Sequence, residues 1–142
     1  MAGYSDTPLI KKLGIRPGDK VLISRAPAGF DRELGDLPEG VRVVGAKARD
    51  LNVVLLFAMS LNDLRKQLEA VADRIVPDGM IWAIWPKKSS GVPSDLTEGV
   101  VQQLGLGIGL VDVKVCAVTE IWSGLKFVYR LKDRTRLAVA GK

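Results

Sequence analysis

Two almost uninterrupted apolar runs constrain the fold of this chain more than any other feature. The first, Leu51 to Ala58, is LNVVLLFA, and the second, Met80 to Trp85, is MIWAIW. A strand with one face in water alternates apolar and polar residues, whereas a strand covered on both faces is apolar throughout. The two runs therefore predict central strands of a parallel sheet with helices on both faces.

Shorter segments of both kinds surround these runs. Further strands are expected at 20–24, 41–45, 110–119 and 125–131, and helices at 7–13, 28–37, 60–75 and from residue 95. Thr7 and Ser60 are the expected N-caps, and Asp95 with Glu98 resembles a capping box. Strand and helix alternate until a terminal hairpin. The sequence therefore predicts an α/β domain with a mainly parallel sheet of about six strands and an antiparallel end.

The length of 142 residues is that of one domain. We expect this domain to span residues 1–132 and a basic tail to span 133–142. The net charge of +5 is carried by the last 17 residues: Lys126, Arg130, Lys132, Arg134, Arg136 and Lys142 against Asp133. A protein that follows phosphates spreads its basic residues over a face and interleaves aromatic residues. Nucleic acid is therefore not the expected partner.

Neither a membrane span nor a secreted protein is expected. The longest uninterrupted apolar run, Val53 to Met59, is far shorter than the roughly 20 residues that cross a bilayer. The single cysteine, Cys116, cannot form an internal disulfide, which is typical of a cytoplasmic protein.

The chain contains no histidine, which excludes Ser-His-Asp and Cys-His catalysis and the commonest zinc ligand. We therefore predict no catalytic residue and no metal site. Cys116 lies within an apolar strand and is interpreted as a core residue. The glycines of the segment Gly105 to Gly109 come after a predicted helix rather than before one, so they indicate a helix end and not a dinucleotide loop.

Two phrases resemble class I S-adenosylmethionine-dependent methyltransferases. Leu13 to Ile23 reads LGIRPGDKVLI and is similar to that family's "LGIKPGDRVLDLGCGPG", and Ile75 to Trp82 reads IVPDGMIW and is similar to its "LKPGGxLxxxxP". The resemblance covers nearly the whole chain, shortened by about one strand and one helix. It implies a Rossmann-like sheet with the order 2-1-3-4-6-5 in the strand numbering of this chain.

The residues that would hold that family's cofactor depart from its pattern. The family has an acidic residue at the end of the first strand and glycines after it, whereas this chain has Ser24-Arg-Ala-Pro-Ala-Gly29, in which only Gly29 is retained. Arg25 adds a positive charge where a cationic sulfonium would lie. The second strand ends at Gly45 without an acidic residue, and Asp50 is too far along the chain. No cofactor is therefore expected, with S-adenosylmethionine as the alternative.

Four further segments resemble short bacterial proteins that are catalogued as a domain of unknown function. They are Tyr4 to Leu9, Ala26 to Phe30, Trp85 to Gly91 with Asp95 to Glu98, and Val115 to Phe127. This resemblance implies no activity.

Loops that leave the carboxyl ends of parallel strands meet at one edge of the sheet, where such folds bind ligands. This rule selects the candidate ligand-binding residues Arg25, Ala28, Gly29, Ser60, Lys87, Lys88, Ser89, Ser90, Glu120 and Trp122. Lys87 to Gly91 combines two cations, two hydroxyls and a glycine ahead of a predicted helix N-terminus, a pattern that favours anions. A solvated turn is the alternative. Trp122 either stacks on a ligand or packs against the sheet.

Two functions follow from these observations. The first is a non-catalytic binding or regulatory module whose edge takes a small anionic ligand or a protein partner. The second is an active S-adenosylmethionine-dependent methyltransferase with atypical cofactor contacts. The oligomeric state is not predicted.

Overall fold

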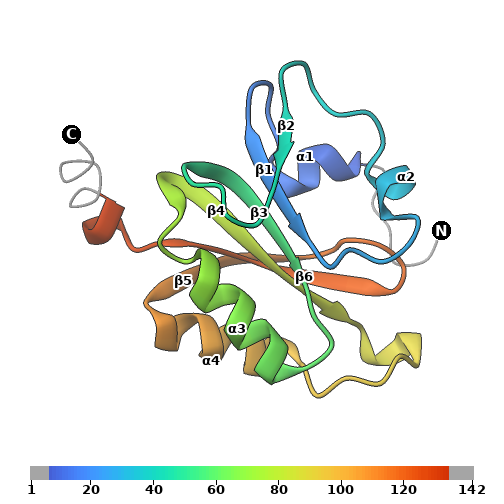
Figure 1. The fold of residues 1–142 in the computed structure, drawn as a ribbon. Coiled ribbons are helices and arrows are strands. Elements are labelled where there is room, and N and C mark those ends of the chain that lie inside the picture. Colours follow the sequence, from blue (N-terminus) through green and yellow to red (C-terminus); the bar gives the residue numbers. More distant parts are fainter. Residues whose placement is uncertain (1–6, 135–142) are drawn as a thin grey trace.

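A computed structural model of the chain describes residues 7–134 and has an α/β architecture (Figure 1). The elements in chain order are α1 (Leu9–Leu13), β1 (Lys20–Ser24), α2 (Phe30–Leu34), β2 (Arg42–Val44), β3 (Leu51–Phe57), α3 (Leu61–Val71), β4 (Ile75–Pro86), the 3-10 helix η1 (Lys88–Ser90), α4 (Glu98–Ile108), β5 (Leu110–Ala117) and β6 (Trp122–Tyr129). None of the helices in these residues is long and apolar enough to cross a membrane.

The strands form one six-stranded sheet with the order β2-β1-β3-β4-β6-β5. β1 pairs in parallel with β2 and with β3, and β3 pairs in parallel with β4. β6 pairs antiparallel with both β4 and β5. β5 therefore runs in the direction of the parallel strands, and the turn between β5 and β6 lies at their carboxyl ends. The expected order and the antiparallel end of the sheet are confirmed.

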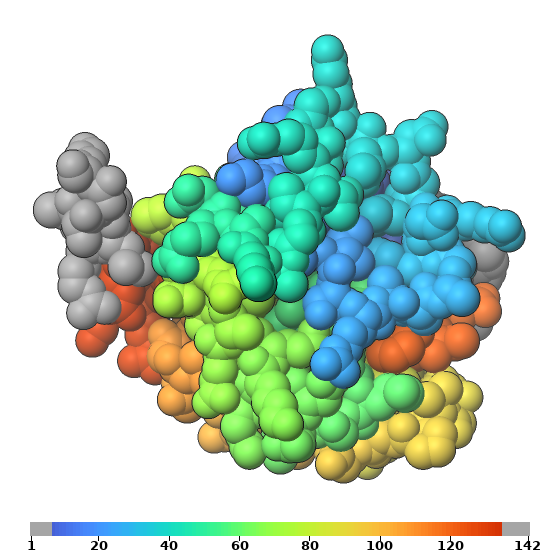
Figure 2. Space-filling model, viewed as in Figure 1, coloured from blue at the N-terminus to red at the C-terminus, as the bar shows by residue number. Residues whose placement is uncertain are grey.

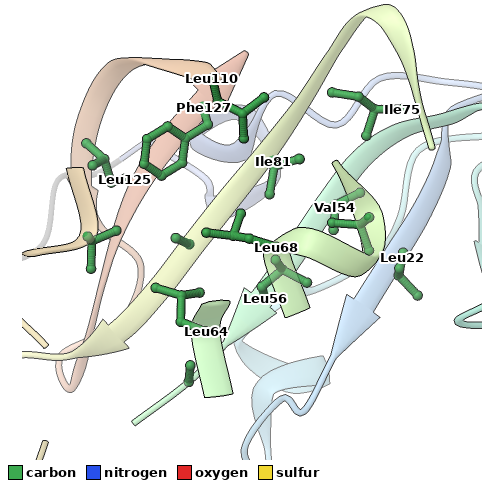
Figure 3. Packing of buried hydrophobic residues seen from close by; sticks show 14 of the residues in the cluster. Leu22, Val54, Leu56, Leu64, Leu68, Ile75, Ile81, Leu110, Leu125 and Phe127 are labelled. Carbon is green, nitrogen blue, oxygen red and sulfur yellow. The ribbon is translucent and has the colours of Figure 1, made fainter. Parts of the chain in front are cut away.

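Helices cover both faces of the sheet, and each face has its own apolar core. On one face, α3 and α4 pack over side chains of β3, β4 and β6 such as Val54, Ile81 and Phe127 (Figure 3). On the other face, α1 and α2 pack over Val53, Trp82 and their neighbours. All side chains of β3 except Asn52 are buried, which confirms that its apolar sequence marks a central strand.

The start of β4 differs from the prediction. The sequence indicates a helix that reaches Ile75 and then a turn at Pro77 to Gly79, but α3 ends at Val71 and the chain is already extended from Ile75. Ile75 pairs with Leu51, and the register shifts between this pair and the next. A Cβ at Gly79 would lie 2.9 Å from the carbonyl oxygen of Leu51, so the glycine permits this close passage. The predicted turn is therefore an irregularity within the strand.

The start of α4 also differs. Thr97, not Asp95, is its N-cap, and the Thr97 hydroxyl accepts a hydrogen bond from Val100 N at 3.3 Å. The Asp95 carboxylate instead accepts a bond from Leu61 N at 2.8 Å, at the beginning of α3. A carboxylate that caps a different helix cannot be recognised from local sequence. At its other end α4 runs through Gly105 and Gly107, which the sequence placed after the helix, so the predicted turn there is wrong. Only Gly109 ends the helix, in the left-handed conformation.

Smaller differences concern both ends of the chain. Pro8 holds the N-cap position of α1 in place of Thr7, and no side chain caps that helix. The helix expected at 28–37 is reduced to α2. Residues 131–134 form a helical turn, in which Arg134 Nε donates to Tyr129 O at 3.0 Å. Most of the predicted basic tail and the N-terminal segment with Tyr4 lie outside the described residues.

Candidate functional site

The carboxyl ends of β1, β3, β4 and β5 bring their loops to one edge of the sheet, on the right-hand side of Figure 1. The candidate residues follow these strand ends: Arg25, Ala28 and Gly29 after β1, Ser60 after β3, Lys87 to Ser90 after β4, and Glu120 after β5. Trp122, expected in the hairpin turn, is the first residue of β6, because residues 123 and 124 already pair with β5. The fold therefore places all of them along this edge. Their side chains have different surroundings.

Arg25 forms an ion pair at the end of β1. Its guanidinium Nη1 lies 3.0 Å from Asp63 Oδ1, and the Arg25 side chain is 66% exposed. The second carboxylate oxygen, Asp63 Oδ2, accepts a hydrogen bond from Gln67 Nε2 at 2.9 Å. Both oxygens of Asp63 are therefore engaged within the protein. At this edge, both the Arg25 guanidinium and the Asp63 carboxylate therefore already have a partner within the protein.

The backbone of Arg25 is left-handed, with a φ of 59°. In the motif that the chain resembles, this position is the first glycine of the loop after the strand. Residues other than glycine adopt this left-handed backbone conformation at a cost of about 1–2 kcal/mol. An ion pair this exposed contributes little in return. Arg25 is thus a place of local strain.

We predict that Arg25→Gly is more stable than Arg25→Ala by about 1 kcal/mol. Both variants lose the ion pair with Asp63, so only the backbone conformation separates them. Urea denaturation of the two variants measures the difference. Equal stabilities would show that the left-handed conformation at this position carries no strain.

The N-terminus of α3 is closed by protein groups. The hydroxyl of its N-cap, Ser60, accepts a bond from Asp63 N at 3.2 Å, and Asp95 accepts from Leu61 N. Free N–H groups at a helix start attract anions, but here the side chains of Ser60 and Asp95 already take two of them. Ser60 is therefore a capping residue in this structure.

The segment Lys87 to Gly91 is a tight turn that contains η1. Lys87 N donates to Ile121 O at 2.8 Å, which ties the turn to the hairpin. Ser90 Oγ donates to Lys87 O at 2.6 Å and accepts from Val92 N at 3.2 Å, which stabilises the turn internally. α4 begins only at Glu98, so the turn does not lead directly into a helix N-terminus.

Lys87, Lys88 and Ser89, which we call the lysine turn, present their side chains at the edge. Lys88 and Ser89 are exposed, and Lys87 is partly exposed. Neither lysine forms an ion pair within residues 7–134. The lysine turn follows β4, two strands from Arg25. Ser24 is level with Leu56 and Leu56 with Ala83, so the lysine turn also lies further along the strand direction than Arg25.

Trp122 packs against the sheet. Its ring contacts Phe57 edge-on with a centroid separation of 5.3 Å, and Phe57 contacts Phe30 in the same way at 4.8 Å. Trp122 belongs to the apolar layer under α1 and α2. Of the two alternatives, the structure therefore supports packing. Glu120, in the turn before β6, is exposed.

The edge does not fit S-adenosylmethionine. Within the described residues, β2 is followed by Gly45 and Ala46, and no carboxylate stands at its end to accept bonds from ribose hydroxyls. Asp50 directly precedes β3 and so lies at the opposite, amino-terminal edge of the sheet. Asp63 is occupied by Arg25 and Gln67. Gly29, the one glycine shared with the family's motif, follows Ala28 and is left-handed, with a φ of 86°. The helix that it begins, α2, has only five residues.

Cys116 does not have the surroundings of a nucleophile. Burial raises the pKa of its thiol, while the charges of Lys12 and Lys114 act in the opposite direction. The thiolate is the reactive form, so a raised pKa lowers reactivity at neutral pH. Across residues 7–134, no group of three or more acidic or cysteine side chains is placed to hold a metal ion.

A cluster of cations on β5 and β6 was not anticipated from the sequence, which placed the positive charge in the tail. Lys114 and Lys126 are directly opposite on the two strands. Burial lowers the pKa of Lys126, as do the charges of Lys114, Arg16 and Arg134. Only the pairing register brings these residues together, so sequence spacing could not reveal the cluster.

We predict that Lys126→Gln stabilises the protein at neutral pH by about 0.5 kcal/mol, because like charges opposite each other on paired strands repel. The gain should shrink at high salt. Since the folded state holds the Lys126 proton less tightly than the unfolded state, wild-type stability should gain from this group as pH rises toward 10.5. Urea titrations at several pH values check both effects. Lys88→Gln, on η1, is the control that should leave stability unchanged.

Comparisons with known proteins concern the fold. No family model and no curated protein matches the chain. Solved structures do match. A SAM-dependent methyltransferase from Aquifex aeolicus superposes with a TM-score of 0.63 at 17% identity, over 84% of this chain and 86% of that one. The DhpI–SAH complex superposes with a TM-score of 0.61 at 12% identity, over 87% and 83%.

A third structure, a TehB-like SAM-dependent methyltransferase from Corynebacterium glutamicum, has a TM-score of 0.53 at 10% identity, over 86% of this chain and 85% of that one. Each of these three chains is matched over most of its length. The chain therefore has a methyltransferase-like fold, with a mostly parallel six-stranded sheet that ends in antiparallel C-terminal strands.

Proposed function

We propose that the chain is a non-catalytic, cytoplasmic binding module that retains the methyltransferase-like sheet and takes a small anionic ligand at the lysine turn. We also propose that the chain is related to the short bacterial proteins of unknown function that its sequence resembles. One observation carries it. The carboxylates of Asp63 and Asp95 at this edge are bonded within the protein, whereas Lys87 and Lys88 have no ion-pair partner in the described range.

This distribution of charge favours anions over the cationic cofactor of the similar proteins. A sulfonium compound would meet two lysines that form no ion pair in the described range, and the carboxylate nearest the end of β1, that of Asp63, is already paired with Arg25. A phosphate or carboxylate compound would meet the lysines and the exposed Ser89 hydroxyl without breaking an existing bond. Charge-assisted hydrogen bonds of this kind are about twice as strong as neutral ones.

The test is a thermal melt with pyrophosphate, ATP and citrate as probes of the lysine turn. At about 100 times its dissociation constant a ligand adds roughly 2.7 kcal/mol, which is several degrees in a domain of this size. The shift should be lost in Lys87→Ala/Lys88→Ala. It should persist in Lys11→Ala/Lys47→Ala, which removes the same charge elsewhere. If both double variants lose the melting-temperature shift equally, the shift depends only on net charge and the proposal is wrong.

The methyltransferase alternative is retained because the similar structures include SAM-dependent methyltransferases matched over most of their length. It predicts a shift with S-adenosylmethionine or S-adenosylhomocysteine that disappears in Gly29→Ala. That result would replace the non-catalytic proposal. The wild-type protein is expected to show no shift with either compound.

A further inference from the structure

A cleft lies on the α3 face of the sheet, away from the lysine turn. It has a volume of about 450 Å³, within the range of small-molecule sites. Figure 2 shows it as a hollow between the end of β1 in blue, the connection that follows β2 in teal and α3 in green. Leu22 and Leu56 from the sheet and Val71 from the end of α3 are buried and form its apolar floor and corner. Arg25, Ala46 and Lys66 are exposed and surround its mouth.

The cleft exists because no helix covers this part of the sheet. β2 and β3 are joined by residues 45–50 alone, and the helices that flank β1 in sequence, α1 and α2, pack on the other face. On the α3 face, the part of the sheet beyond α3, around β1 and β2, therefore has no helix over it. In Figure 3, Leu22 lies at this end of the apolar cluster, far from Phe127.

The wall formed by α3 contains a polar group whose bonding is incomplete. Gln67 lines the cleft and is only 8% exposed. Its Nε2 donates to Phe57 O and to Asp63 Oδ2, both at 2.9 Å. Because both partners are acceptors, they fix the orientation of the amide. Its Oε1 is therefore a buried acceptor, and no donor among the described residues reaches it.

A buried acceptor without a donor is rare in folded proteins and is commonly completed by a water or a ligand. The lining supplies the other requirements of a ligand. Its floor is apolar, and Lys66 at its mouth forms no ion pair within the described part of the chain. Arg25, paired with Asp63, adds a second cation beside it.

We infer that this cleft, the α3 cleft, is a binding site for a small organic anion: an apolar, flat body on Leu22, Leu56 and Val71, an N–H or O–H group directed to Gln67 Oε1, and an acidic group at Lys66. The site is separate from the lysine turn, which follows β4, and it does not depend on the function proposed for that turn.

The probe is 8-anilinonaphthalene-1-sulfonate, which combines a flat apolar ring system, one N–H and one sulfonate. Folded wild-type protein is expected to bind it saturably with one molecule per chain. Lys66→Glu should weaken binding at least tenfold, whereas Lys88→Glu at the lysine turn should not change it. Ala70→Phe, which fills the cleft from an exposed position, should abolish binding. Asn62→Phe adds the same ring to α3 outside the cleft and should leave binding intact.

Two readouts guard against misinterpretation. The dye also binds loosely packed states, so near-ultraviolet circular dichroism of each variant must match that of the wild type. In nitrogen-15 spectra of the wild type, dye binding should shift the side-chain amide resonances of Gln67. Saturable binding that is lost in Lys88→Glu but kept in Lys66→Glu would place the dye at the lysine turn and overturn the α3 cleft. Absence of saturable binding, or unmoved Gln67 resonances, would also overturn it. Neither result bears on the thermal melts, which test anion binding at the lysine turn independently.

Discussion

Replacing Gly105 by alanine is expected to destabilise the protein by about 3 kcal/mol. Gly105 lies in α4, where a Cβ would be 2.1 Å from Cε1 and 2.3 Å from Cζ of Phe127. Phe127 is fully buried between α4 and the sheet, so its ring has no open space to enter. Either the ring must leave its preferred rotamer or α4 must move outward. The melting temperature should fall by about 10 °C.

Gly107→Ala in the same helix is the control. Apart from its chain neighbours and the nearby backbone of α4, no atom of the described residues lies within 4 Å of the position of its Cβ, and Gly107 is exposed. Alanine there should stabilise the helix by about 0.5–1 kcal/mol because it loses less backbone entropy on folding. The opposite signs of the two changes separate the clash from helix propensity. A Gly105→Ala protein as stable as the wild type would show that α4 does not lie this close to Phe127.

Trp82→Phe is expected to cost about 3 kcal/mol. The Trp82 side chain is fully buried in the layer under α1, and its Nε1 donates to Leu13 O at 3.0 Å. Phenylalanine leaves a void where the indole was and removes the donor of a carbonyl at the end of α1. The indole thus fastens α1 to the centre of β4. Urea denaturation followed by circular dichroism measures the loss.

Trp85→Phe, three residues further along β4, is the matched control. Trp85 is on the opposite face, is 5% exposed, and its indole donates no hydrogen bond to the described residues. The same loss of volume should there cost about 1 kcal/mol. If both variants lose the same stability, the bond from Trp82 to Leu13 contributes nothing measurable.

The arrangement of the sheet was predictable because its strands are marked by composition. The side chains of β3 from Val53 to Phe57 and of β4 from Met80 to Trp85 are buried on both faces, and their sequences are apolar throughout. What could not be predicted depends on contacts between distant segments. Ile75 fits the apolar spacing of α3 and also fits a strand, and its pairing with Leu51 decides between them. Asp95 fits a capping box but caps α3 instead.

The candidate edge was predictable from topology, whereas its chemistry was not. The rule that parallel strands end at one edge placed Arg25, Lys87 and Trp122 along it. Whether each side chain faces solvent or the protein depends on partners far away in sequence. Asp63, in α3, pairs with Arg25, and the ring of Phe57 contacts that of Trp122. Gln67 and the α3 cleft were not anticipated, because a glutamine inside an amphipathic helix has no distinguishing pattern.

The bond from Asp95 to Leu61 has a consequence for protein engineering. It comes from the connection that follows η1 and ends on the first residue of α3. A designer who wished to install nucleotide binding at this helix start would have to remove the Asp95 carboxylate and would thereby loosen the path of the chain into α4. A bound nucleotide and the Asp95 carboxylate would therefore compete for the Leu61 N–H. The design would need a new interaction that holds residues 91–97 in place before Asp95 is replaced.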